Sequence, residues 1–163
     1  MPRQMWLPFG ERQIKMNLRT LKIAVPFIWF GMVLAISFIE APLKFQAPGI
    51  TLPLGLGIGR LVFFALNKME IIAAFLLIFA FWRGRINTRS ETGLLSSVLL
   101  VLLLETVWLL PVLDARAELV IVGTAPPFSG THIVYIVFDA AKLIALMTLG
   151  IITVRNTLQE AER

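Results

Sequence analysis

Residues 94–113 read LLSSVLLVLLLETVWLLPVL, an apolar run in which Glu105 is the one ionisable side chain. A membrane-spanning helix needs about 20 predominantly apolar residues, so this stretch is long enough to cross a bilayer. Three similar stretches occupy residues 21–39, 60–82 and 133–154. The sequence therefore predicts an all-α integral membrane protein built as a four-helix transmembrane bundle.

The composition agrees with this interpretation. Of 163 residues, 58% are hydrophobic and 15% are charged, whereas a soluble chain has about 45–50% apolar and about 25% charged residues. Four spans leave only short connections, so we expect residues 1–163 to form a single transmembrane domain. Membrane lipids are its expected partners, and we expect no nucleic acid, because the net charge of +5 follows membrane topology and does not mark a basic soluble face.

The sequence has few residues that could bind a metal ion or a cofactor. The chain contains no cysteine, which excludes disulfides, thiolate metal sites and cysteine nucleophiles. His132 is the single histidine, so one chain cannot hold a haem between two histidines. No spacing of a catalytic triad or of paired catalytic carboxylates is present, and we expect no cofactor and no metal site.

The segments outside the spans have two distinct characters. Residues 1–20 are basic and contain Pro8 and Gly10, a pattern that predicts an interrupted segment lying at the headgroup surface. Residues 40–59 are apolar but contain three prolines and four glycines. We predict that they form a Pro/Gly-rich outer connection between the first two spans, packed on the bundle so that its backbone groups find partners.

The positive charges predict an orientation. Five Lys and Arg residues lie in the N-terminal segment through Lys22, three lie between the second and third spans, and two follow the fourth. The other two connections hold three when Arg60 at the start of the second span is included. Cytoplasmic loops carry an excess of Lys and Arg. Both termini are therefore predicted to be cytoplasmic, in a multi-pass protein of the cell inner (plasma) membrane. Before the third span, Thr88 and Glu91 have the spacing of a capping box, which predicts a helix start.

Polar side chains inside the spans are the functional candidates. An ionisable group there costs about 2.5–3.5 kcal/mol on insertion scales and is treated as functional by default. The predicted buried polar network consists of Asn67, Lys68, Glu70, Glu105, Asp139 and Lys142. The predicted outer mouth consists of Glu40, Arg60, Asp114, Arg116, His132 and Tyr135. At about 1.5 Å of rise per residue, Glu70, Glu105 and Lys142 fall near the bilayer midplane.

Helical spacing predicts which of these groups meet. The fourth span carries polar groups at spacings of three, four and three residues, which places them on one helix face. These residues are His132, Tyr135, Asp139 and Lys142. Lys68 points away from Glu70, so we expect it to meet a different helix or another subunit. Trp29, Trp82 and Trp108 are expected to face lipid or the interface, as tryptophans in spans do by default. The alternative for Trp108, which lies one turn from Glu105, is that it lines the same cavity.

The charge count suggests a hypothesis. Three carboxylates stand against two ammonium groups in the spans, and burial disfavours a charged carboxylate. One of Glu70, Glu105 or Asp139 is then protonated at neutral pH and able to exchange its proton.

Four interpretations of the network stay open. In the first, the network only fixes the register of the helices; in the second, it serves a proton- or solute-linked pathway. In the third, it belongs to a membrane enzyme or redox factor that acts on a lipid-soluble substrate, and in the fourth, to a structural subunit of a larger complex. Because four helices are few to enclose a pathway, we expect a homo-oligomer or a larger membrane complex.

Three motifs carry a resemblance to a known group. They are EAPLKF at 40–45, ETVWLLPVLDAR at 105–116 and THIVYIVFDAAK at 131–142. The chain resembles an uncharacterised group of small four-span membrane proteins, the domain-of-unknown-function group that includes transmembrane protein 205-like chains. Its members share a proline after a polar third helix and a histidine that opens the fourth. The resemblance implies the four-span architecture and adds little about mechanism.

Overall fold

The computed structural model describes residues 9–84, 88–124 and 129–162, and the regular secondary structure in these ranges is all helical. Four helical segments in it are long and apolar enough to cross a membrane: Asn17–Gln46, Leu52–Arg83, Arg89–Ile121 and Thr131–Glu160. Each contains one of the stretches that the sequence singles out. The protein is therefore an all-helical chain with four candidate membrane spans, each longer than its predicted core.

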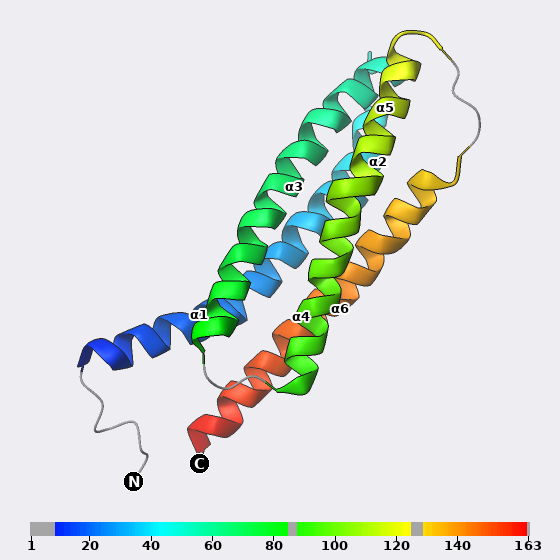
Figure 1. Cartoon of the computed structure of the whole chain (residues 1–163). Helices are drawn as coiled ribbons and strands as arrows, with labels where there is room; N and C mark the ends of the chain where they lie inside the picture. Colours follow the sequence, from blue (N-terminus) through cyan, green and yellow to red (C-terminus); the bar gives the residue numbers. More distant parts are fainter. Residues whose placement is uncertain (1–8, 85–87, 125–128, 163) are drawn as a thin grey trace.

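Consecutive spans run in opposite directions (Figure 1). The elements are α1 (Phe9–Val33), the π-helix η2 (Leu34–Glu40), α2 (Ala41–Leu43), the 3-10 helix η3 (Lys44–Gln46), α3 (Leu52–Arg83), α4 (Arg89–Leu104), the π-helix η4 (Glu105–Leu109), α5 (Leu110–Ile121) and α6 (Thr131–Glu162). The start of α1, the end of α3, the start of α4 and the end of α6 lie at one end of the bundle, here called the terminal end (Figure 1). The start of α3, the end of α5 and the start of α6 lie at the other, the loop end (Figure 1).

The core toward the terminal end is apolar. Leu77 of α3, Val98 of α4, and Leu146 and Leu149 of α6 have no exposed surface and belong to one packed cluster. Inside a bilayer such helices are held together mainly by close van der Waals packing, because lipid tails are as apolar as Leu and Val side chains. Side-chain packing therefore closes this half of the bundle.

The connection between the first two spans is shorter than predicted. Helix α3 begins at Leu52, where the Thr51 hydroxyl accepts a hydrogen bond from the Leu54 backbone N–H at 3.4 Å and Pro53 lies in the first turn. A hydroxyl cap and an early proline both favour a helix start. Only residues 47–51 separate η3 from α3, so the prediction of a non-helical stretch over 40–59 was wrong in extent.

Two glycines inside α3, Gly55 and Gly59, have side chains of the preceding segment packed against them. A Cβ atom on Gly55 would collide with the ring of Phe45, and one on Gly59 would lie 3.0 Å from Nζ of Lys44. Glycine normally weakens a helix interior by about 1 kcal/mol relative to alanine. Here the missing side chains let η3 lie directly on α3.

Two of the prolines inside spans each follow a π-helical segment and do not end the span. Pro42 follows the π-helix η2, and Pro111 follows the π-helix η4. Proline lacks the N–H for the usual helical bond and clashes with the carbonyl four residues earlier, and a π-helical turn ahead of it shifts the hydrogen-bond register. The third span therefore continues to Ile121 instead of ending near Pro111 as predicted.

Two helix starts bear on local predictions. The capping box is confirmed, since the Thr88 backbone N–H donates to Oε2 of Glu91 at 2.8 Å and the Glu91 N–H donates to the Thr88 hydroxyl at 3.3 Å. In the N-terminal segment, α1 is helical from Phe9 onward, so Gly10 does not interrupt it, whereas Pro8 lies outside the described residues. The start of α1 projects away from the other helices (Figure 1).

Candidate functional site

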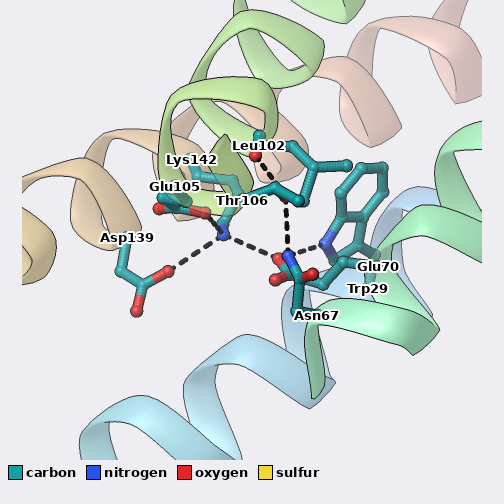
Figure 2. Close-up of polar contacts among 8 residues, drawn as sticks. All are labelled: Trp29, Asn67, Glu70, Leu102, Glu105, Thr106, Asp139 and Lys142. Carbon is teal, nitrogen blue, oxygen red and sulfur yellow. Dashed lines mark hydrogen bonds and ion pairs between the residues drawn. The ribbon is translucent and has the colours of Figure 1, made fainter. Parts of the chain in front are cut away.

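Lys142 of α6 lies inside the bundle, surrounded by three carboxylates (Figure 2). Its Nζ lies 2.6 Å from Oε1 of Glu70 on α3 and 3.0 Å from Oδ1 of Asp139, one turn earlier on α6. It also donates a hydrogen bond to Oε2 of Glu105 in η4. All four side chains are at most 1% exposed. These four residues of the predicted network form one group, called the Lys142 cluster.

Trp29 of α1 connects the remaining span to the cluster. Its indole Nε1–H donates to Oε1 of Glu70 at 2.8 Å, and the side chain has no exposed surface. The prediction that Trp29 faces lipid was wrong, because a carboxylate inside the bundle satisfies its N–H. Trp108 is 52% exposed, as expected for a lipid-facing tryptophan.

The sequence around Trp29 is apolar on every side of the helix and marks no interior face, whereas the structure does. Buried residues recur on the first span at helical spacing, and they are Leu18, Lys22, Val25, Trp29 and Val33. This face marks Trp29 as interior despite the default for its residue type.

Asn67 lies beside the cluster and forms a hydrogen bond between the helices that carry it. Its Nδ2 donates to the hydroxyl of Thr106 at 2.8 Å, and that hydroxyl donates to the backbone carbonyl of Leu102 at 2.7 Å (Figure 2). The pair ties α3 to the π-helical segment that contains Glu105. Thr106 was not singled out from the sequence, although it follows Glu105 directly.

Lys68 is exposed, so its assignment to the buried network was wrong. Two residues along an α-helix turn the side chain by about 200°, which directs Lys68 away from the face that holds Glu70. One ammonium group therefore faces three carboxylates. If fully ionised, the Lys142 cluster would hold two uncompensated negative charges, one more than the sequence count suggests.

The carboxylates of the cluster differ in their partners. Glu70 contacts both Lys142 and Trp29. By contrast, Oε1 of Glu105 is buried without a hydrogen-bond partner among the described residues. Oδ2 of Asp139 is likewise unpartnered there, whereas its Oδ1 contacts Lys142. Glu70 is thus the best-supported counter-ion, while Glu105 and Asp139 each have one oxygen free to carry a proton.

A pocket of about 320 Å³ lies toward the loop end, and Asp139 lines it. Its aromatic lining comprises Phe38, Phe45, Phe63, Phe64 and Tyr135. Its polar lining comprises Ser37, Lys44, Arg60, Asp114, His132 and Asp139. Along α6, His132 and Tyr135 precede Asp139, so Asp139 is the lining residue of this helix nearest to Lys142. The loop-end pocket therefore leads from the end of the bundle to the cluster.

Ion pairs surround the mouth of the pocket. Arg60 of α3 contacts Asp114 of α5 through Nε to Oδ1 at 2.5 Å, and it also pairs with Glu118. Lys44 pairs with Glu40 at 3.3 Å. Glu118 was not predicted as a mouth residue, although its position four residues after Asp114 places both on one helix face.

The other predicted mouth residues divide into two groups. His132 and Tyr135 line the pocket together with Arg60 and Asp114. His132 is exposed, whereas Tyr135 is 4% exposed and its ring packs edge-on against Phe63 with centroids 5.6 Å apart. Arg116 is half-buried on α5 and lies outside the pocket lining.

The terminal side of the cluster is different. A smaller pocket of about 80 Å³ lies at that end, lined in part by Lys22, Glu91 and Thr153. Between Lys142 and Thr153, α6 buries Leu146 and Leu149 completely in the apolar core. In the described part of the chain, the cluster thus has a pocket on its loop side and packed apolar side chains on the other.

No family model matches the chain, no curated protein matches it, and no solved structure matches it. Membership of the transmembrane protein 205-like group therefore stays a prediction. The function has to be argued from the chemistry of the Lys142 cluster and the loop-end pocket.

Proposed function

We propose that this chain is a proton-linked membrane protein whose Lys142 cluster exchanges protons through the loop-end pocket, where a ligand binds. The observation that supports it is the charge imbalance of three buried carboxylates around one ammonium group. An uncompensated charge buried away from water is very costly, and the group neutralises instead. Two protons on the cluster remove the imbalance.

The partners of each carboxylate suggest where the protons reside. Glu70 accepts from Trp29 and contacts Lys142, so it stays ionised as the permanent counter-ion of Lys142. Glu105 and Asp139 hold the protons on their unpartnered oxygens. Asp139 lines the pocket, so its proton is the one that exchanges with water and ligand.

The orientation proposed with this function places the loop end outside the cell. The excess of Lys and Arg in the N-terminal segment, the α3–α4 connection and the C-terminal tail favours the terminal end as the cytoplasmic one. The pocket then takes protons and ligand from the outer side of the plasma membrane. Transport, as distinct from binding, requires the apolar core around Leu146 to open toward the cytoplasm in a second conformation.

Lys68 supports an oligomer or a larger complex as part of the proposal. It is exposed near the middle of α3, where an unpaired lysine facing lipid costs about 2.5–3.5 kcal/mol. Contact with a second copy or another membrane subunit removes that cost.

Infrared difference spectroscopy of the protein in lipid nanodiscs tests the proton assignment. When the pH is lowered from the alkaline range, where both carboxyl groups are ionised, we expect a carboxylic acid band in the parent protein that is reduced in Asp139→Asn and in Glu105→Gln. Both variants keep the side-chain shape and reduce the charge excess, so they should fold. Lys68→Met is the matched control and should leave the band unchanged. A parent spectrum with no band that either carboxyl variant removes would refute the proposal.

A further inference from the structure

We propose that the ligand of the loop-end pocket is an organic cation, an apolar or aromatic body with a protonated amine, whose ammonium group takes the place of the proton at Asp139. This inference rests on the proposed function and names the class of ligand for the same site. It follows from the charges, the unpartnered acceptors and the rings that line the pocket.

The charges at the mouth are already compensated. Lys44 pairs with Glu40, and Arg60 pairs with two carboxylates, Asp114 and Glu118. Their cationic groups are thus engaged and offer little to an anionic ligand. Deeper in the site, the Lys142 cluster has an excess of carboxylates over ammonium groups. The charges around the pocket therefore favour a cation.

Two buried polar atoms of residues that line the pocket have no hydrogen-bond partner among the described residues. They are Oδ2 of Asp139 and the hydroxyl oxygen of Ser37. The second carboxylate oxygen of Asp139 points away from Lys142 (Figure 2). An ammonium group has three N–H donors and no acceptor. It therefore supplies what a carboxylate oxygen and a hydroxyl oxygen can accept.

The aromatic lining suits the rest of such a ligand. Nζ of Lys44 lies 5.6 Å from the ring centroid of Phe63 and 5.7 Å from that of Phe45. A cation within about 6 Å of an aromatic ring is attracted by it. The pocket thus already holds one alkylammonium group of its own chain among its rings, which shows that the lining accepts this chemistry.

The size of the pocket limits the ligand. Its volume of about 320 Å³ lies at the lower end of the range of about 300–1,000 Å³ for small-molecule sites. One aromatic ring with a short aminoalkyl chain fits this space, whereas a large multi-ring drug does not.

The proton and the amine compete for the carboxylate of Asp139. With Asp139 protonated, its carboxyl group is neutral and its attraction for an ammonium ion is lost; when the proton leaves through the pocket, the amine replaces it. The charged and titratable groups facing this position are Lys142, Tyr135 and His132 of α6, Glu70 and Arg60 of α3, Glu105 of η4, Asp114 of α5 and Lys44 of η3. Acidification should therefore weaken amine binding by protonating Asp139, while the mouth pairs affect access.

Three probes of matched shape test the ligand class: phenethylamine, which is a cation, phenethyl alcohol, which is neutral, and phenylacetate, which is an anion. Binding to the protein in nanodiscs is measured by calorimetry, with released protons detected as a buffer-dependent heat. We expect phenethylamine to bind and release protons. In Asp139→Asn its affinity should fall about tenfold or more, because a hydrogen bond to a charged group is lost.

Lys68→Met serves as the control and should bind phenethylamine like the parent. The inference is overturned if phenylacetate or phenethyl alcohol binds as tightly as phenethylamine, if no probe binds, or if Asp139→Asn leaves the amine affinity unchanged. The infrared band described above separates the two proposals. If it persists in the parent while amine binding fails, only the ligand class is wrong, and if it is absent, the proton linkage itself is wrong.

Discussion

Nζ of Lys142 lies 2.6 Å from Oε1 of Glu70, joining the middle of α6 to the middle of α3. The same oxygen accepts the indole N–H of Trp29 at 2.8 Å, so one carboxylate oxygen connects three of the four spans. A buried ion pair is tolerated when further hydrogen bonds satisfy the charged groups. This junction therefore holds the ionised part of the cluster in place, while Glu105 and Asp139 remain able to change charge.

Removing the central cation should destabilise the fold. In Lys142→Met the ionised Glu70 loses its counter-ion, and breaking a buried pair from one side costs about 3–5 kcal/mol. The loss should be largest at alkaline pH and shrink on acidification, because protonated carboxyl groups need no counter-ion. Unfolding in mixed micelles measures it.

Lys68→Met is the matched control for that experiment. Lys68 is an exposed lysine of α3, and its replacement should not lower the free energy of unfolding, because it removes a charge that is costly at mid-span. Equal effects of the two substitutions would contradict the assignment of Lys142 as the central cation.

The Trp29 contact predicts a difference between two tryptophans. Trp29→Phe keeps a ring in the core but removes the donor to Glu70, and a hydrogen bond to a charged group contributes about 1.5–3 kcal/mol. Trp108→Phe, at a residue that is 52% exposed, should change the free energy of unfolding by less than about 0.5 kcal/mol. Thermal unfolding in the same detergent compares them. A larger loss in Trp108→Phe would speak against the buried contact.

Two glycines of α3 test the packing of η3. Alanine gains helix propensity equally at Gly55 and Gly57, but only at Gly55 would its Cβ meet the Phe45 ring. Overpacking costs about 1–3 kcal/mol, so Gly55→Ala should be less stable than Gly57→Ala by that amount. The free energies of unfolding of the two variants provide the check, and equal values would show that Phe45 does not lie on α3.

Single cysteines test the orientation, since the chain contains none of its own. His132→Cys places a thiol at the loop-end pocket, and Thr157→Cys places one at the terminal-end pocket. With a membrane-impermeant maleimide on intact cells, we expect labelling of the first variant only. The second should react after the membrane is permeabilised. The reverse pattern would invert the proposed topology.

Much of the architecture was predictable because span length and hydropathy dominate folding in a bilayer. The four helices and the meeting of Glu70, Glu105, Asp139 and Lys142 followed from apolar runs, depth and helical spacing. The helix limits did not, because the packing of Phe45 and Lys44 on α3 and the π-helical turns before two prolines depend on tertiary contacts.

Other errors came from default rules for residue types. Trp29 was expected at lipid because most tryptophans in spans lie there, yet its N–H has a carboxylate partner. Lys68 was counted in the network by depth alone, although its direction on the helix already argued against it. Glu118 was overlooked because a carboxylate at a helix end gives no signal until its partner, Arg60, is known.

Trp29 also provides a reporter of the cluster, because its indole N–H contacts the carboxylate at the centre. Replacing Trp6, Trp82 and Trp108 by phenylalanine leaves Trp29 as the sole tryptophan of the chain. A protonation change at the cluster alters the charge beside the indole and therefore its emission.

The most direct measurement follows this emission in oriented proteoliposomes while the pH on each side of the membrane is changed separately. We expect a shift of the Trp29 emission when the compartment facing the loop-end pocket is acidified, no shift when the other compartment is acidified, and a reduced response in Asp139→Asn. An emission that ignores the pocket-side pH, or follows the pH of the terminal end, would contradict proton exchange between the Lys142 cluster and the loop-end pocket.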